Sequence, residues 1–98
     1  MPSRPPVAAD LGFLHTPDYR YVRKGDALMM LGVVQSRAIR ILHQAAGAEV
    51  PWRSGKTILG EAGATSLRMA DVFKSQPDWK TFIESDERGN YRLLLEAA

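Results

Sequence analysis

Apolar positions recur at helical spacing in the middle of the chain. In residues 33–46 (VVQSRAIRILHQAA) one face collects apolar side chains: Val34, Ala38, Ile41, Leu42 and Ala45. The opposite face is polar and carries Arg37, Arg40 and Gln44. This spacing of three and four residues predicts an amphipathic helix. Gly47 follows as the expected C-cap, because glycine readily adopts the backbone conformations that end helices.

Two pairs of strand-like segments flank this region. Residues 19–23 (YRYVR) and 27–31 (ALMML) are rich in aromatic and apolar side chains, and the turn sequence Lys-Gly-Asp separates them. Near the end of the chain, residues 79–84 and 91–95 are apolar-rich runs on either side of the turn sequence SDERGN. Each pair predicts a β-hairpin.

Two shorter helices are predicted between the hairpins. Residues 54–63 (SGKTILGEAG) have a capping serine at one end and a terminating glycine at the other. Residues 64–76 (ATSLRMADVFKSQ) offer Thr65 and Ser66 as N-caps, and Pro77 ends this helix. The expected core residues of the two helices are Ile58, Leu59, Ala62, Met69, Val72 and Phe73. We expect Leu67 to pack sideways against the preceding helix and Trp52 to anchor the connector in the core.

The composition is that of an ordinary soluble domain. The 98 residues are 45% hydrophobic and 24% charged, which suits a single core. Residues 1–12 contain no apolar signal region, so we expect a flexible tail followed by one domain over residues 13–98. No apolar run approaches the roughly 18 residues that span a membrane. Cysteine is absent, which excludes disulfides and thiolate zinc sites and fits a cytoplasmic location.

Charge is distributed unevenly along the chain. The net charge is only +2, but residues 20–56 carry seven basic and two acidic side chains, whereas residues 57–98 carry five basic and seven acidic ones. Positive charge therefore lies mostly ahead of the helix predicted over residues 64–76. Because phosphates are bound by cations, this distribution constrains any nucleic-acid model.

The order of helix, turn, helix and hairpin resembles the winged helix-turn-helix DNA-binding domains, including the effector domains of bacterial response regulators. The chain is most similar to small bacterial and phage-type members. The resemblance covers about residues 13–95 and rests on HTPDYRYVRKGD (15–26), QSRAIRILHQA (35–45), TSLRMADVFKSQPDWKTFI (65–83) and GNYRLLL (89–95). It implies an α+β fold in which three helices lie between an N-terminal β-hairpin and a C-terminal β-hairpin wing.

The resemblance also implies that the helix containing Ser66, Arg68, Asp71 and Lys74 enters the major groove of DNA. The planar guanidinium of Arg68 suits a bidentate contact with guanine, and Lys74 suits a phosphate. Asp71 is expected to pair with both in the free protein and to orient Arg68 in the complex. The alternative for these residues is an ordinary solvated helix face with charge pairs. For Leu67, on the same outward arc, contact with a thymine methyl group or with a protein partner is the alternative to packing against the preceding helix.

Further DNA contacts are expected from the preceding helix and from the wing. Lys56, Arg53 and Ser66 are candidates for phosphate anchors, the last at a helix N-terminus with its partial positive charge. Arg88 and Asn90 are expected to reach DNA from the wing turn. The same turn carries Asp86 and Glu87, which repel phosphates, and the alternative for Arg53 and Lys56 is that they only aid solubility.

The sequence thus predicts a small DNA-binding protein with double-stranded DNA as its partner, a transcriptional regulator or accessory factor of bacterial or phage type. A homodimer or a larger protein complex would add affinity, because one such module binds weakly alone. The alternative is a winged-helix protein–protein interaction module, an inhibitor or assembly subunit of phage or mobile-element type without DNA binding.

Enzymatic chemistry is not expected from this sequence. The SGKT segment at residues 54–57 lacks the earlier glycine of a phosphate-binding loop, and no serine sits in a nucleophile motif. His15 and His43 lie far apart without a metal-ligand spacing. We therefore expect no metal and no cofactor.

Overall fold

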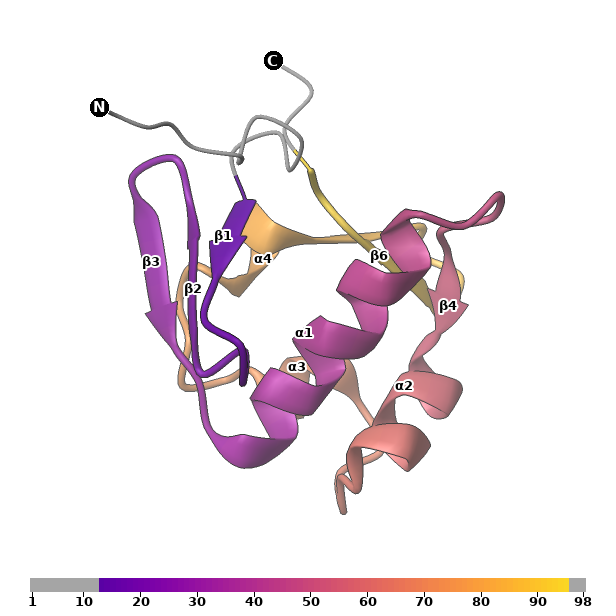
Figure 1. The fold of residues 1–98 in the computed structure, drawn as a ribbon. Coiled ribbons are helices and arrows are strands. Elements are labelled where there is room, and N and C mark those ends of the chain that lie inside the picture. Colours follow the sequence, from indigo (N-terminus) through magenta and orange to yellow (C-terminus); the bar gives the residue numbers. More distant parts are fainter. Residues whose placement is uncertain (1–12, 96–98) are drawn as a thin grey trace, which may run out of the picture.

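A central helix lies between two small antiparallel sheets (Figure 1). This computed structural model describes residues 13–95 of the chain. The tail expected over residues 1–12 lies outside the described residues, as do residues 96–98. The described part is an α+β fold of six short strands and four helices in the order β1-β2-β3-α1-β4-α2-α3-α4-β5-β6.

The first sheet contains β1 (Phe13–His15), β2 (Tyr21–Lys24) and β3 (Ala27–Met30), paired antiparallel in that order. The predicted hairpin is confirmed as β2 and β3, and β1 is an additional strand too short to show a periodic pattern. Alternation of side chains turns Phe13, Val22 and Met29 to the core, where each is at most 2% exposed.

The central helix α1 (Val33–Ala46) has the predicted bounds and ends at Gly47. Its buried face includes the predicted Ala38, Leu42 and Ala45 but also Ile39, while Val34 and Ile41 are only half-buried. The shift follows from the position of α1, because it packs against α2 and against the second sheet at the same time. The buried face of α1 is therefore rotated about the helix axis relative to the face that the apolar spacing in the sequence predicts.

The second sheet joins β4 (Arg53–Ser54), β6 (Asn90–Leu93) and β5 (Ile83–Ser85) in that spatial order. The sequence prediction missed β4, which adds a two-residue strand to the predicted hairpin. On this sheet Nε of Arg92 lies 2.6 Å from Oε1 of Glu84, and the Arg92 guanidinium lies 4.9 Å from the centre of the Trp52 ring. Trp52 is half-buried under this cation and does not anchor the core as predicted.

Helix α2 (Gly55–Ala62) confirms the capping signals in the sequence. The Ser54 hydroxyl oxygen accepts the Thr57 N–H at 3.1 Å, and Gly63 ends the helix with a φ of +78°. At such a φ glycine avoids the clash that other side chains meet. The predicted Ile58, Leu59 and Ala62 are all buried.

The helix predicted over residues 64–76 is wrong in length, because α3 covers only Met69–Val72. Neither Thr65 nor Ser66 caps it; Arg68 stands at the N-cap and makes no capping side-chain bond. In a longer helix the Val72 carbonyl would accept the Gln76 N–H, but here it accepts the Gln35 side-chain amide at 2.8 Å. The Gln76 N–H turns instead to the Phe73 carbonyl at 2.8 Å.

The segment predicted as the first wing strand begins as a helix, α4 (Trp79–Phe82), before β5 starts at Ile83. One helical turn brings Trp79 and Phe82 to the same side, since residues three apart lie on one face. Phe82 is fully buried, and the Trp79 ring stacks on Phe73 with their centres 5.6 Å apart. The fold therefore has four helices instead of the three expected.

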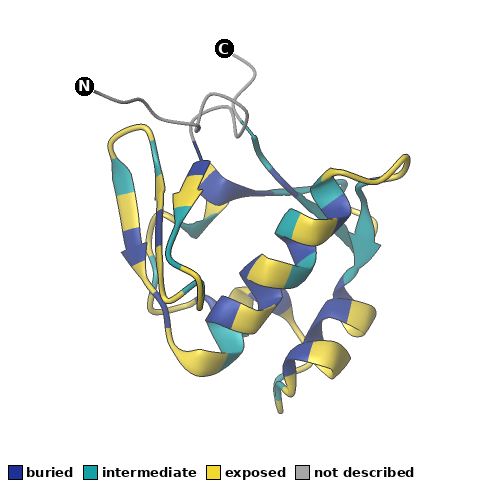
Figure 2. Cartoon of the chain, viewed as in Figure 1, coloured by how far each residue is buried: buried dark blue, intermediate teal, exposed yellow. Residues whose placement is uncertain are grey.

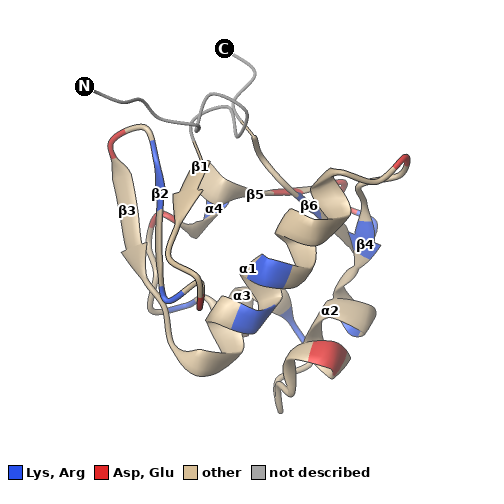
Figure 3. Cartoon of the chain, in the orientation of Figure 1, with Lys and Arg blue, Asp and Glu red and all other residues tan. Residues whose placement is uncertain are grey.

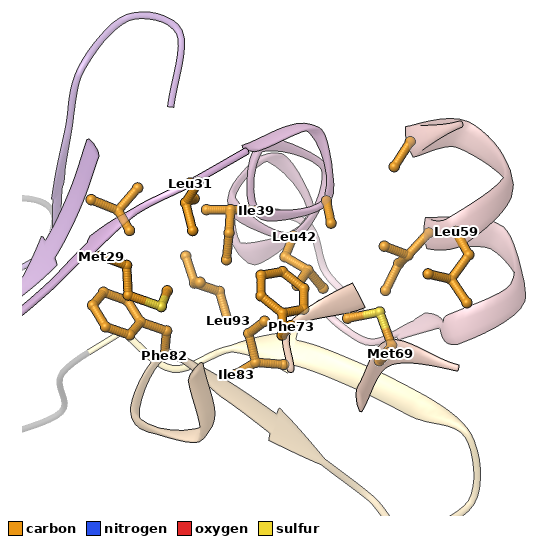
Figure 4. Close-up of a cluster of buried hydrophobic side chains, with 14 of the residues drawn as sticks. Met29, Leu31, Ile39, Leu42, Leu59, Met69, Phe73, Phe82, Ile83 and Leu93 are labelled. Atoms are coloured by element: carbon orange, nitrogen blue, oxygen red, sulfur yellow. The ribbon is translucent and has the colours of Figure 1, made fainter. Parts of the chain in front are cut away.

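The core draws on both sheets and all four helices (Figure 4). Buried positions recur on one side of α1 and of α2 (Figure 2). The largest fully buried side chains are Phe13, Phe73, Phe82, Met29, Ile39, Leu42, Ile58, Met69 and Val22. None of the helices in residues 13–95 is long and apolar enough to cross a bilayer.

Gln35 joins three parts of the fold, so its loss should destabilise the protein. Its amide oxygen accepts the Gly32 N–H at 2.9 Å and the Gln76 side chain at 3.1 Å, and its amide nitrogen donates to Val72. We expect Gln35→Ala to lower the free energy of unfolding by about 1–3 kcal/mol, measured by urea denaturation. Gln44→Ala, an exposed change on the same helix, should stay within about 0.5 kcal/mol of wild type. Equal effects of the two substitutions would contradict this role.

The two glycines of α2 should respond in opposite directions to substitution. A methyl group on Gly55 would lie 3.0 Å from Cε1 of Tyr91, whereas one on Gly60 would meet nothing within 4 Å. We expect Gly55→Val to lower the free energy of unfolding by about 1–3 kcal/mol through overpacking. Gly60→Ala should raise it by about 0.4–1 kcal/mol, because alanine has less freedom to lose. Thermal and urea denaturation of both variants measure these shifts, and a stabilising Gly55→Val would refute the close packing.

Candidate nucleic-acid interface

The first turn of α2, the start of α3 and the turn end of the β5–β6 hairpin meet at Gly55. The Gly55 N–H donates to the Gly89 carbonyl at 2.8 Å. A methyl group built on Gly55 would lie 3.6 Å from Cγ of Met69 and 3.0 Å from Tyr91, which belong to α3 and β6. The register of the second sheet places Asn90 opposite Ser54. Three elements that are separate in sequence therefore share one junction.

Each of these elements carries an exposed cation next to its junction residue. Lys56 follows Gly55, Arg68 precedes Met69, and Arg88 precedes Gly89. We call Lys56, Arg68 and Arg88 the junction cations. Lys74, just beyond α3, is also exposed. Three residues that the sequence analysis proposed from separate segments are thus chain neighbours of positions that meet at Gly55.

The predicted pairing of Asp71 with its neighbours is not formed. Asp71 is exposed on α3, and within residues 13–95 no ion pair joins it to Arg68 or Lys74. The ion pair of this described segment is the one between Arg92 and Glu84. Lys56, Arg68 and Lys74 therefore form no ion pair with a carboxylate from residues 13–95, and Arg88 lies near the Asp86 carboxylate without forming an ion pair with it.

Two other predicted contact residues are engaged within the protein. Nη1 of Arg53 donates to the carbonyl oxygens of Val50 and Trp52, both at 2.8 Å, so this side chain fixes the connector before β4. The Asn90 side-chain amide donates to Oδ2 of Asp86 at 2.8 Å. Both residues are half-buried and act first on local structure.

Asp86 organises the turn between β5 and β6. Its Oδ1 accepts the N–H groups of Arg88 at 2.7 Å and Asn90 at 3.0 Å. The hydrogen bond from the Asn90 side chain is the main cause that holds the pKa of Asp86 below its ordinary value, with further help from the two backbone bonds and the nearby Arg88 charge. This carboxylate is therefore a structural part of the turn, while the adjacent Glu87 is exposed.

The connection between α2 and α3, residues 63–68, differs most from the expectation. Leu67 is 90% exposed and does not pack against α2 as predicted. Ser66 is half-buried, and Thr65 and Arg68 are exposed. Because α3 has only four residues, it is about 6 Å long and cannot by itself line a major groove. The surface that α3 presents consists of this connection together with the helix.

Most of the upstream cations lie away from the Gly55 junction, although Lys56 is itself a junction cation. Arg37 and Arg40 are exposed on α1, and the basic positions of α1 face the viewer in Figure 3 while α3 lies behind that helix. In the first sheet region, Nε of Arg20 donates to the Leu31 carbonyl at 2.6 Å. Arg37 and Arg40 thus form a second basic surface on α1, and Nη1 of Arg37 also reaches the Ala62 carbonyl at the end of α2, 3.4 Å away.

Two histidines that are far apart in sequence meet beside Tyr19. The ring centres of His15 and His43 lie 4.9 Å apart, the Tyr19 hydroxyl lies 2.8 Å from Nδ1 of His43, and His15 stacks on Tyr19. Spacing along the chain could not have found this cluster. Within residues 13–95 no group of three or more histidine, cysteine or acidic residues is arranged to hold a metal ion.

The Asp86 hydrogen bonds predict a specific pH response of the turn. Because the folded pKa is lowered, these bonds stabilise the turn above the ordinary pKa of 3.8 and the stabilisation is lost as pH falls through the folded value. Asn90→Ala should raise the Asp86 pKa towards 3.8, measured by NMR titration of the carboxyl carbon. Asp18, whose pKa is lowered by bonds from the Arg20 N–H and the Thr16 hydroxyl, serves as the internal control and should not change. An unchanged Asp86 pKa would disprove the assigned cause.

No protein-family model, no curated protein and no solved structure matches the chain.

Proposed function

We propose that this protein is a winged-helix protein that binds double-stranded DNA, as a regulator or accessory factor in the cytoplasm. Three features support this assignment. Helix α1 is followed by the strand β4, which pairs with β6 of the C-terminal hairpin. Helices α2 and α3 follow with a short connection, and the β5–β6 hairpin comes after them. This is the order of helices and wing that winged helix-turn-helix domains use.

The observation that carries the proposal is the set of junction cations. Lys56, Arg68 and Arg88 are exposed, come from α2, α3 and the wing, and lie next to residues that touch at Gly55. Phosphate contacts supply most non-specific affinity for DNA, and they need cations spread along one surface. Lys74 extends this surface beyond α3.

The short α3 changes the proposed division of roles. A one-turn helix offers few side chains to base edges. We therefore assign the base contacts to the connection before α3, with Arg68 contacting guanine. Lys56, Lys74 and Arg88 contact phosphates, and Ser66 adds a hydroxyl donor. Arg53 and Asn90 support the surface from the second sheet. Asp86 and Glu87 limit the contribution of the wing turn, so a dimer or a larger complex provides the remaining affinity.

A protein–protein interaction module is the second candidate, and one observation favours it. A groove of about 420 Å³ lies between α3, α4 and the β5–β6 hairpin. Apolar side chains from Trp79, Tyr91 and Leu94 line it together with two acidic residues, Glu84 and Glu87, and one basic residue, Lys80. Aromatic surface beside carboxylates suits a basic segment of another protein.

Salt dependence of binding separates the two functions. With a random-sequence duplex, wild-type protein should bind at about 50 mM salt and lose affinity steeply by about 200 mM. Lys56→Ala and Lys74→Ala should each weaken binding to all sequences and reduce the slope of log K against log salt by about one, whereas Arg68→Ala should relax preference at one base position. Arg40→Ala on α1 is the matched control, because it removes one exposed cation from the other basic surface.

Two results of this titration would count against DNA binding. No detectable binding at about 50 mM salt would reject it and favour the interaction module. Equal losses of DNA affinity for Arg40→Ala and Lys56→Ala would show that DNA is attracted by the positive charge of the whole protein, and that the Gly55 junction is not the binding surface.

A further inference from the structure

Leu67 is the most exposed large apolar residue of the described chain. Its exposed fraction is 90%, against 63% for Met30 and 62% for Val50. A leucine that remains in water forgoes the free energy that its burial would release. Single exposed leucines are common on surfaces, so exposure by itself carries no function. The position of this leucine is what makes it informative.

Leu67 projects from a segment that is fixed at both ends. At the start, the Ala64 N–H donates to the Leu59 carbonyl at 2.9 Å, and Gly63 closes α2. At the end, Met69 is 1% exposed and holds the beginning of α3 in the core. Figure 1 shows this connection at the lower end of the molecule, beyond the body formed by α1 and the sheets. A side chain that is exposed on such an anchored segment can enter a groove about 12 Å wide.

The side chains around Leu67 match those that read base edges. Thr65 and Ser66 supply hydroxyls on one side, and exposed Arg68 supplies a guanidinium on the other. In the major groove, arginine pairs with guanine O6 and N7, hydroxyls pair with several bases, and an apolar group contacts the 5-methyl group of thymine. Within this row Leu67 is the one large apolar side chain.

We propose that Leu67 is a specificity-determining residue that contacts the 5-methyl group of thymine beside the guanine contacted by Arg68. This inference rests on the proposed DNA binding and adds to it the identity of a preferred base. On this assignment the leucine is exposed in the free protein because its apolar partner is on the DNA. Burial of one methyl group accounts for a change in affinity of about fourfold.

Uracil is a direct probe of this contact, because it lacks only the 5-methyl group of thymine. The duplex that wild-type protein enriches from a randomised library is made twice, once with thymine and once with uracil. Wild-type protein should bind the thymine duplex about fourfold more tightly. Leu67→Ala should bind both duplexes alike. Leu28→Ala, which removes a leucine 59% exposed on β3, should keep the wild-type preference.

The outcomes distinguish this inference from the proposed function. If wild-type protein binds DNA but prefers neither duplex, or enriches no sequence, the thymine contact is wrong while DNA binding stands. If Leu67→Ala keeps the preference, another residue reads the methyl group and the assignment fails. If Leu67→Ala instead dissociates a dimer in sedimentation experiments and leaves DNA affinity unchanged, Leu67 docks on a second copy. If no duplex binds at low salt, both proposals fall.

Discussion

The burial of α1 on two sides is the constraint on which the rest of the structure depends. Ala38, Ile39 and Leu42 are fully buried between the two sheets and α2. Each sheet has three strands of no more than four residues and one apolar face, which must be buried against another element. Both sheets therefore need the apolar surface of this one helix, and the other helices are arranged around it.

This arrangement also determines where the candidate interface lies. The core-facing side of β6 packs on α1, which leaves the turn at Gly89 beside the first turn of α2. Gly55 permits that approach because it has no side chain where Tyr91 and Met69 come close. The junction cations then lie on neighbouring elements, although the sequence separates the first from the last by about a third of the chain.

The same packing limits the chemistry of the interface. The Val72 carbonyl accepts the Gln35 amide where a continuing helix would have it accept the Gln76 N–H, and α3 ends after one turn. A long recognition helix is replaced by a short helix and a fixed connection that exposes Leu67 and Arg68. For the proposed DNA binding, this surface offers several cations to phosphates and few side chains to base edges.

Local signals in the sequence were enough to predict several elements and part of the site. Periodicity and turn chemistry within a few residues predict the bounds of α1, both caps of α2 and the β2–β3 hairpin. They also predict that Lys56, Arg68 and Lys74 are exposed. Three features depend on the folded arrangement instead. These are the end of α3, the hydrogen bonds that hold the Arg53 and Asn90 side chains within the protein, and the exposure of Leu67.

The sequence by itself determined the amphipathic helices, the turns and the excess of cations ahead of α3, since these depend on side chains that are close along the chain. Only the tertiary structure decided where α3 ends, which cations share a surface and which leucine remains in water. Gln35 lies 37 positions before the carbonyl that it occupies, and no local pattern can encode a hydrogen bond across that separation.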